Sequence, residues 1–384
     1  MSELFDRVAK NLVTRKERIE SGQINCIPFG LPRFEKEFPG VEQKTYYQIT
    51  ASTKVGKTQI TDFLLMYQTL MYAYKHREQV RLKVFYFSLE MSAEQKYQQM
   101  LCHILFRMSK GKIRIDPKDL RSTKADKPLP QQILEILGTD EYQDFFEFFE
   151  KSVVFIDQIR NPFGIYNFVR DYASTHGTQH KKRVDFTDNS TGEVKEHEID
   201  DYYEPDDPDE YVIVIVDHMA LLTPEKGTTT RDAMVELSSK YFIKMRNKFK
   251  YIPVAVVQQA AAQESNENKK LNKLRPTLDG FGDAKVIARD ADIILGLFSP
   301  YRHEIPEYMG YNITHWKDNI RFLEIIAGRE GGGGTLCPLF FDGGVNYFFE
   351  LPLPTDTVEL NKAEALADRA RNSKIFMMAY RHKK

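Results

Sequence analysis

Cysteine is scarce in this sequence. Only Cys26, Cys102 and Cys337 occur among 384 residues, in an odd number, widely spaced and within apolar stretches. This pattern argues against a disulfide framework, and no metal-ligand spacing links the three residues. We therefore expect buried, reduced thiols in a cytoplasmic protein.

Long apolar runs are missing as well. No run approaches the roughly 20 apolar residues that a membrane-spanning helix needs. The first residues, Met1 to Arg7, are too polar for a signal peptide. We expect no membrane partner and a cytoplasmic location.

An excess of charge of one sign is also absent. The chain has 54 basic and 55 acidic residues, a net charge of −1, so any contact with nucleic acid must come from local patches. What is present is an ordinary globular composition, 42% hydrophobic and 12% aromatic. A chain of this length can bury a substantial core in one large or two modest domains.

The strongest local motif is a phosphate-binding loop. It lies between a β-rich run, Tyr46 to Thr50, and a helical pattern of apolar residues from Ile60 to Tyr74. In such loops the backbone amides and the helix N-terminus surround the phosphates, Lys57 adds a charge, and the Thr58 hydroxyl ligates Mg²⁺. The predicted cofactor-binding residues are Ala51, Ser52, Thr53, Lys54, Val55, Gly56, Lys57 and Thr58. Ala51 replaces the first glycine of the usual motif.

Several short runs read as strands buried on both faces. They are residues 82–87, 153–156, 211–216, 252–257, 292–298 and 322–327. Near-continuous Val, Ile and Phe indicate a mainly parallel sheet with helices on both faces, an α/β fold. The runs 335–341 and 345–349 are joined through Asp342-Gly-Gly344 and predict a terminal β-hairpin.

We expect three regions along the chain. Residues 1–22 contain an amphipathic helix with Phe5, Val8 and Leu12 on a narrow stripe. Residues 23–350 form the main domain, with a polar surface insertion at about 174–209 that reads as a hairpin around Asn189 to Gly192; it is either a partner-contact loop or a tolerated decoration. Residues 351–384 form a helical tail with a basic end, Arg381 to Lys384.

Two acidic residues follow predicted strands. Asp217 ends the apolar strand Val212 to Val216, at the edge where ligands of open α/β sheets bind, so it is a candidate for the metal shell. Glu90 ends the strand after the loop helix in the same way. It is the candidate for the base that polarises the attacking water.

Six segments, taken together and in order, resemble the RecA-like motor domain of DnaB-type hexameric replicative helicases. The most specific is Ser88-Leu-Glu-Met91, which in that family supplies the catalytic glutamate. The resemblance covers roughly residues 23 to 350. The other segments are Ile27 to Phe34, Ala51 to Thr58, Val216 to Leu222, Val256 to Gln259, and Asp283 to Asp292.

The resemblance implies a RecA-like P-loop NTPase fold that uses ATP and Mg²⁺. It assigns catalysis to Lys57, Glu90, Gln259 as sensor of the γ-phosphate, and Arg329 as a basic finger given to the neighbouring subunit's ATP. The metal residues are Thr58 and Asp217. Many relatives carry a lysine where Ala327 stands, and a shifted alignment would put Arg329 on that lysine instead.

DNA contact is expected from two loops facing the channel of a ring. The first spans 223–231, with Lys226, Gly227 and Arg231; the second spans 279–285, with Gly282 and Lys285. Side-chain and backbone donors of such loops can follow the phosphates of single-stranded DNA. Both loops contain few basic residues, so the alternative is that they are ordinary solvent-exposed loops that do not bind DNA.

The resemblance thus implies a hexameric, ATP-dependent helicase that moves on single-stranded DNA, with primase or a helicase loader as partners. The family's N-terminal helical domain is not found here, which favours a reduced form such as a phage helicase, with the stripe of residues 3–20 packing on a neighbouring subunit. One alternative is a RecA- or KaiC-like ATPase in recombination or assembly without unwinding. Another is a non-hydrolysing assembly factor, against which the intact Glu90 argues.

Overall fold

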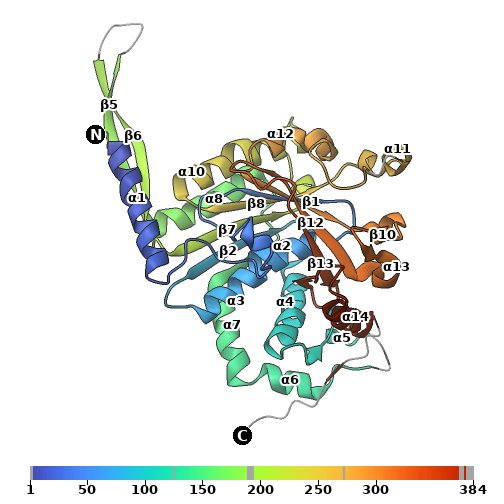
Figure 1. The fold of residues 1–384 in the computed structure, drawn as a ribbon. Coiled ribbons are helices and arrows are strands. Elements are labelled where there is room, and N and C mark those ends of the chain that lie inside the picture. The colour runs from blue at the N-terminus through green and yellow to red at the C-terminus, as the bar shows by residue number, and fades with distance from the viewer. Residues whose placement is uncertain are drawn as a thin grey trace.

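A nine-stranded sheet forms the centre of the protein. The computed structural model describes residues 3–123, 125, 127–187, 194–270, 273–371 and 376–377, and helices cover both faces of the sheet (Figure 1). In spatial order the strands are β14 (Tyr347–Glu350), β13 (Leu336–Asp342), β12 (Ile320–Gly328), β9 (Ile293–Phe298), β1 (Tyr47–Ala51), β8 (Ile252–Gln258), β7 (Glu210–Asp217), β2 (Arg81–Ser88) and β4 (Val153–Ile156).

Six neighbouring strands, from β9 to β4, run parallel. All five residues of β1 are buried, as are seven of the eight residues of β7. These central strands are covered on both faces, so alternation disappears and apolar runs take its place. The predicted α/β fold with a mainly parallel sheet is therefore confirmed.

The remaining three strands run antiparallel. The predicted terminal hairpin is present as β13 and β14. The run at 322–327, however, belongs to β12, which pairs antiparallel with β9 and is bulged between Ile325 and Ala327. Burial on both faces shapes the composition of a strand but does not encode its direction, so the sequence pattern did not distinguish β12 from its parallel neighbours.

The two faces of the sheet carry different helices. One face packs on a continuous helical segment made of α2 (Lys57–Asp62), a π-helical turn (Phe63–Tyr67) and α3 (Gln68–Lys75), together with further helices. The latter are α4 (Ala93–Met108), α6 (Gln131–Leu137) and α7 (Asp140–Ser152), while the short α5 (Pro117–Leu120) contacts α4. The opposite face packs on α8 (Pro162–Thr175), α9 (Thr230–Val235), a π-helical turn (Glu236–Phe242), α10 (Ile243–Phe249) and α12 (Lys285–Ala288).

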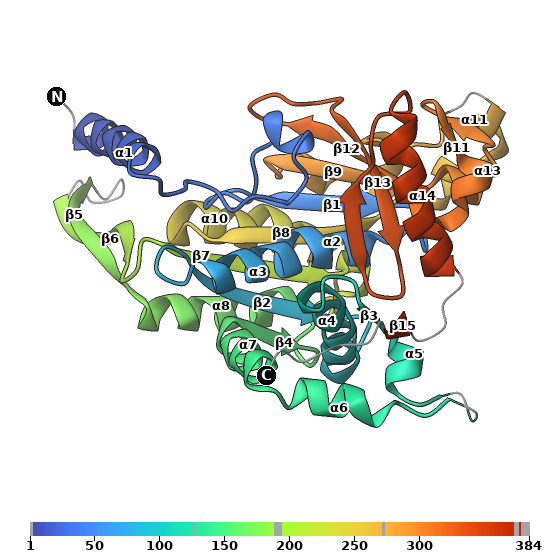
Figure 2. The ribbon, with the colours of Figure 1, turned by 60° about the horizontal axis from the view of Figure 1, so that its bottom comes forward.

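A third, smaller core lies at the antiparallel end of the sheet. Trp316, Phe322 and Phe340 meet Ala363 and Ala367 of α14 (Thr357–Arg371) there. The predicted helix of the C-terminal tail thus docks beside β13 (Figure 2). Short elements complete this region: β10 (Glu307–Tyr308), β11 (Tyr311–Asn312), α13 (Ile313–Trp316) and α11 (Asn266–Lys270). The basic end at 381–384 lies outside the described residues.

A two-residue strand follows α14. This strand, β15 (Phe376–Met377), pairs antiparallel with β3 (Ile113–Arg114). The described part of residues 351–384 therefore contains a helix and a short strand.

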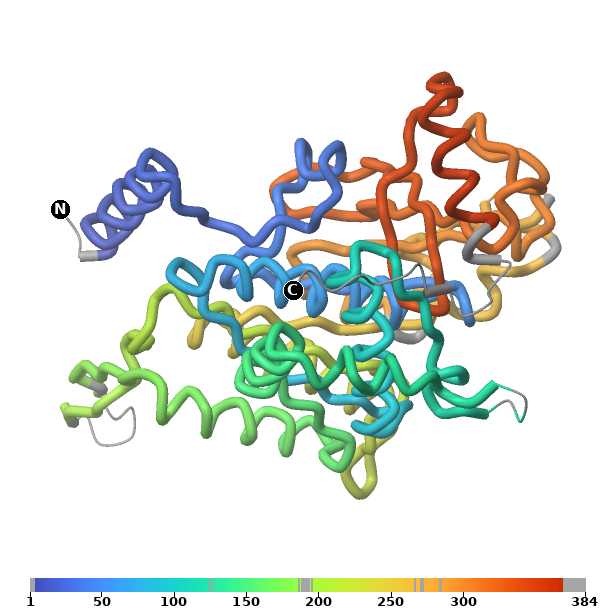
Figure 3. Tube along the Cα trace, turned by 90° about the horizontal axis from the view of Figure 1, so that it is seen from below, coloured from blue at the N-terminus to red at the C-terminus, as the bar shows by residue number. Residues whose placement is uncertain are grey.

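The insertion forms a long hairpin, as the sequence suggested. Strand β5 (Gly177–Thr187) pairs antiparallel with β6 (Val194–Pro205), while the predicted turn at 189–192 lies outside the described residues. The hairpin extends from the body at the same end of the molecule as the N-terminal helix α1 (Glu3–Glu20) (Figure 3).

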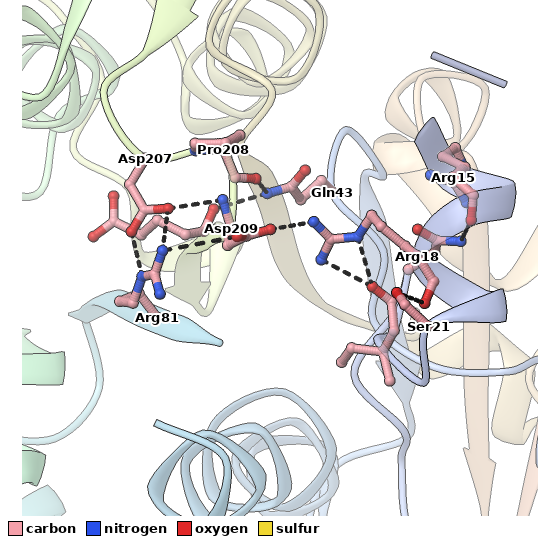
Figure 4. A network of polar contacts seen from close by, with 11 residues as sticks. Arg15, Arg18, Ser21, Gln43, Arg81, Asp207, Pro208 and Asp209 are labelled. Carbon is pink, nitrogen blue, oxygen red and sulfur yellow. Dashed lines mark hydrogen bonds and ion pairs between the residues drawn. The ribbon is translucent and has the colours of Figure 1, made fainter. Parts of the chain in front are cut away.

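Helix α1 is tied to the body at its C-terminal end. The Arg18 guanidinium forms an ion pair with Asp209, beside the start of β7, and the Arg81–Asp207 pair lies next to it (Figure 4). Arg15 adds a contact of 2.6 Å with Glu42. By contrast, the predicted apolar stripe is exposed, with Leu12 at 64% and Phe5 at 53%. No described helix is long and apolar enough to cross a bilayer.

Candidate active site

Four adjacent strands, β1, β8, β7 and β2, end at one edge of the sheet. The register aligns Ala51 with Gln258, and Ser88 with Asp217. Since all four strands are parallel, the segments that follow them meet at this edge. The structure thereby brings together the predicted phosphate loop, Asp217, Glu90 and Gln259.

The phosphate loop turns through left-handed backbone. Gly56 has φ 108° and precedes α2, and Lys54 has φ 59°. Glycine is favoured at position 56 by this backbone conformation, and an added Cβ would also make a tight contact of 3.3 Å with Gln59 Oε1. Lys57 is largely buried, whereas Thr53 and Lys54 are exposed at the tip of the loop.

Two arginines that sequence reasoning missed hold this loop. Arg321, only 1% exposed, donates from Nε to the carbonyl oxygen of Val55 at 2.7 Å. Arg302 donates from Nη1 to the carbonyl oxygen of Lys54 at 3.0 Å. Both fix the loop from outside, so its shape is set by the protein itself. Arg321 could have been recognised in the sequence as a basic residue within the otherwise apolar run that forms β12.

Thr58 and Asp217 form the candidate metal site. The Thr58 hydroxyl donates to Asp217 Oδ1 at 3.1 Å, and the Asp217 side chain is nearly buried. Two neighbouring ligands of an octahedral Mg²⁺ lie about 3 Å apart, because each oxygen is about 2.1 Å from the ion. The pair therefore fits Mg²⁺. No group of three acidic, histidine or cysteine side chains converges in the described chain, so phosphate and water would complete the shell.

Glu90 follows shortly after β2, the strand that pairs with β7 and Asp217, and its side chain is half exposed. The preceding residue, Leu89, donates its N–H to the carbonyl oxygen of Asp217 at 2.7 Å, which fixes the direction of the chain at this point. His218 Nε2 is 3.9 Å from Glu90 Oε2. Burial, and then the charge of Lys57, lower the pKa of His218, so the imidazole is neutral. Sequence reasoning missed His218, although it directly follows Asp217.

Gln259 connects the phosphate-loop strand with the second predicted DNA loop. Its Nε2 donates to the Thr50 hydroxyl at 2.9 Å and to the Thr277 carbonyl oxygen at 3.3 Å. A Cβ at Gly280 would come within 1.6 Å of Gln259 Oε1. The neighbouring Gln258 donates to the Thr53 hydroxyl at 2.7 Å. Both glutamines thus touch the loop region, but only Gln259 also touches the DNA loop.

The two predicted DNA loops lie on the surface near one another. In the first, Lys226 and Gly227 are exposed, and Arg231 lies in the first turn of α9. The second is a 3₁₀ turn, Asp279–Ala284, broken at Gly282 with φ 54°. It contacts α9, and its Phe281 belongs to the same buried cluster as Ala233 and Met234 of that helix. Lys285 forms a solvent-exposed ion pair with Asp279 of the same loop.

Arg329 is the one predicted catalytic residue that the structure keeps apart from the others. Strand β12 ends with Gly328 opposite Ile293, which in turn aligns with Tyr47, the first residue of β1. The phosphate loop follows the last residue of β1, so Arg329 lies at the opposite edge of the sheet. There its Nε is 3.0 Å from Asp292 Oδ1.

Comparisons with known proteins agree with the motifs. No family model matches the chain. The replicative DNA helicase DnaB of Helicobacter pylori, from two strains, is 24% identical over 295 and 297 residues, which is 77% of this chain and 48% of each relative. This chain therefore spans about half the length of the curated relatives it matches.

Solved structures agree in fold. A DnaB-like replicative helicase, described with its interactions with primase, superposes with a TM-score of 0.60 at 18% identity, covering 88% of this chain and 67% of that one. The ATPase domain of G40P superposes with a TM-score of 0.59 at 17% identity, covering 90% and 99%. The resemblance to DnaB-type helicases and the RecA-like α/β fold are confirmed.

Proposed function

We propose that this protein is an ATP-driven, ring-forming helicase that moves along single-stranded DNA and unwinds duplex at a replication fork. The observation that carries the proposal is the joined site at the sheet edge. Thr58 and Asp217 meet beside the phosphate loop, and Gln259 links that loop's strand to the segment that begins the second DNA loop. A change in the nucleotide bound at the phosphate loop is therefore transmitted through Gln259 to the second DNA loop.

Each residue at the edge has a task in hydrolysis. Loop amides and Lys57 hold the phosphates, and Thr58 and Asp217 hold Mg²⁺, which neutralises charge on the phosphates when bound. Glu90 is proposed to orient the attacking water and accept its proton. Gln259 senses the γ-phosphate and shifts the Thr277–Gly280 segment with it.

Assembly into a ring would explain two features that have no function within a single chain, the position of Arg329 and the exposed apolar face of α1. Arg329 lies too far from its own phosphate loop to act there, so it serves the ATP of an adjacent subunit. The exposed apolar face of α1 packs on a neighbouring copy and holds the ring, which we propose to be a hexamer. Primase or a loader would bind such a ring, since the similar helicase structure is described with primase.

In the channel, DNA is followed by its phosphates. Lys226, Gly227 and Arg231 of the first loop, and Gly282 and Lys285 of the second, supply charge and close backbone approach. Lys285 is released from Asp279 when phosphate replaces the carboxylate as its partner. No base-specific contact is needed for this motion.

Strand separation of a forked duplex tests the proposal directly. The wild-type protein should separate the strands with ATP and Mg²⁺, and Lys57→Ala should not. ATP turnover stimulated by single-stranded DNA but without strand separation would favour a RecA- or KaiC-like ATPase. Absence of any Mg²⁺-dependent ATP turnover would overturn the proposal.

A further inference from the structure

A chain of buried polar side chains reaches Asp217 from the side opposite Thr58. The Tyr86 hydroxyl donates to Asp217 Oδ2 at 3.0 Å. The Lys96 ammonium in turn donates to the Tyr86 oxygen at 2.8 Å. Tyr86 and Lys96 are both 0% exposed, and neither belongs to the predicted site.

The same ammonium is paired with a second carboxylate. Lys96 Nζ lies 2.8 and 2.7 Å from the two oxygens of Asp62, which is also 0% exposed. Asn346, in the turn between β13 and β14, donates to Asp62 Oδ2 at 3.4 Å. An ammonium has three protons, so Asp62 and Tyr86 together occupy all of them.

Because Lys96 donates all three of its protons, the donor and the acceptor of each hydrogen bond in this chain are fixed. Because the Tyr86 oxygen accepts a hydrogen bond from Lys96, its own hydroxyl hydrogen is donated to Asp217. That bond occupies Oδ2 of Asp217 and leaves Oδ1 towards Thr58. The carboxylate is therefore held in the orientation in which one oxygen faces the metal site.

The participating residues also come from the elements that carry the site. Asp62 is on α2, the helix that begins with Lys57 and Thr58. Tyr86 is on β2, and Lys96 is on α4, and the link between these two elements contains Glu90. The network thus fixes Asp217 relative to both the phosphate loop and the candidate base.

We infer that Tyr86 and Lys96 are positioning residues that orient Asp217 for Mg²⁺. The inference rests on the proposed function, in which Thr58 and Asp217 hold the metal. Groups that orient metal ligands typically change metal affinity or activity by about 10- to 100-fold when removed. The buried Lys96–Asp62 ion pair need not stabilise the fold, because the free energy of removing two charges from water can exceed the gain from pairing them.

The test separates metal binding from nucleotide binding. Affinity for a fluorescent N-methylanthraniloyl ATP is measured with Mg²⁺ and again in EDTA. The Mg²⁺ ratio is the affinity with Mg²⁺ divided by the affinity in EDTA, and it reports how much the metal contributes to nucleotide binding. Tyr86→Phe removes only the hydroxyl that reaches Asp217. We expect the ratio to fall about tenfold or more, while the affinity in EDTA stays at the wild-type value.

Tyr47→Phe is the matched control. Tyr47 is also 0% exposed, and its hydroxyl donates to the Gly40 carbonyl oxygen at 3.2 Å, at the far end of β1. Loss of a buried hydroxyl there should destabilise the fold similarly but leave the ratio unchanged. A general loss of stability is thereby separated from a loss of metal orientation.

A second variant tests Lys96. Lys96→Met alone would leave Asp62 as an unpaired buried charge and threaten folding. The double variant Asp62→Leu with Lys96→Met removes both charges, so the fold should persist, as thermal unfolding will show. Tyr86 then loses the ammonium that holds its oxygen in place, so its hydroxyl orients Asp217 less firmly and the Mg²⁺ ratio should again fall about tenfold.

Two results would overturn the inference. If Tyr86→Phe keeps the wild-type ratio while Asp217→Asn abolishes the Mg²⁺ effect, the metal site stands and the positioning role is wrong. If the wild-type protein itself gains nothing from Mg²⁺, the proposed function fails, and the positioning role fails with it.

Discussion

Arg329 and Asp292 form an ion pair at the edge of the sheet opposite the phosphate loop, with 3.0 Å between Nε and Oδ1. The Arg329 side chain is 52% exposed, and such exposed pairs contribute only about 0–1 kcal/mol. The guanidinium also donates to the carbonyl oxygens of Arg289, Asp290 and Ala291, so it must exchange these hydrogen bonds together with the ion pair to reach a phosphate on a neighbouring subunit.

Mixing two inactive variants tests this arrangement. Arg329→Ala and Lys57→Ala should each abolish ATP turnover alone. In a random one-to-one mixture, about a quarter of the interfaces would combine an intact loop with an intact finger. ATPase activity should therefore reappear on mixing.

Arg289→Ala serves as the control for this experiment. Arg289 is an exposed arginine on the same edge, paired with Asp290 at 3.9 Å. That variant should keep full turnover by itself. Failure to recover activity at every mixing ratio would contradict a finger acting between subunits.

Glu90→Gln should uncouple binding from hydrolysis. Loss of a general base lowers turnover by about 10²- to 10⁴-fold, while affinity for ATP remains because Glu90 is not placed to hold the nucleotide. Steady-state ATPase and nucleotide titration measure the two effects. Glu94→Gln, an exposed change in the first turn of α4, is the control; unchanged turnover in Glu90→Gln would remove Glu90 from catalysis.

Gly280→Ala should break the link between the two sites. The added Cβ would lie 1.6 Å from Gln259 Oε1, so the glutamine must move. Because Gln259 also has a proposed task in hydrolysis, we expect a partial loss of basal ATP turnover and a complete loss of its stimulation by single-stranded DNA. At Gly333, an added Cβ would meet nothing within 4 Å, so Gly333→Ala is the control. Full DNA stimulation in Gly280→Ala would show that this contact carries no signal.

Lys226→Ala should weaken DNA binding through charge alone. Each lost phosphate contact reduces the slope of log affinity against log salt by about 0.7 for single strands. Fluorescence anisotropy with a labelled oligonucleotide at several salt concentrations measures this slope. Lys181→Ala, on the β5–β6 hairpin, should leave it unchanged. An equal slope in wild type and Lys226→Ala would exclude Lys226 from the DNA path.

His103 should make the fold sensitive to acid. It is 0% exposed and donates from Nδ1 to the carbonyl oxygens of Val345 and Asn346, and burial lowers its pKa to about 3. The unfolded chain binds the proton near pH 6.5 and the folded chain does not. The stabilisation is therefore complete above pH 6.5 and falls by about 1.4 kcal/mol per pH unit as the pH drops towards 3.

Urea unfolding measures this dependence. The loss of stability between about pH 7 and pH 5 should be smaller in His103→Gln, which keeps a donor for the carbonyls but does not titrate. The exposed His76 provides the control change, His76→Gln. An equal pH dependence in wild type and His103→Gln would contradict the prediction.

Local order along the chain was predictable from the sequence. The strand, loop and helix around Gly56 follow one another directly, and a positive φ at the loop requires glycine whatever surrounds it. The acids at the ends of β2 and β7 were also predictable, because parallel strands place their carboxyl ends at one edge. These features depend on short-range conformation and on the continuous runs of apolar residues that mark buried parallel strands.

Long-range pairing decided the rest. Lys96 lies on α4, and a lysine considered by itself is expected to be exposed to solvent; its partner Asp62, on α2, makes its burial tolerable. The sequence around Arg329 likewise does not show that this residue lies far from Lys57. That distance follows from the antiparallel direction of β12. The sequence alone determined which groups the chain carries and how its strands and helices succeed one another. Tertiary structure decided which charges meet, because the energy of a buried charge depends on partners far away in the chain.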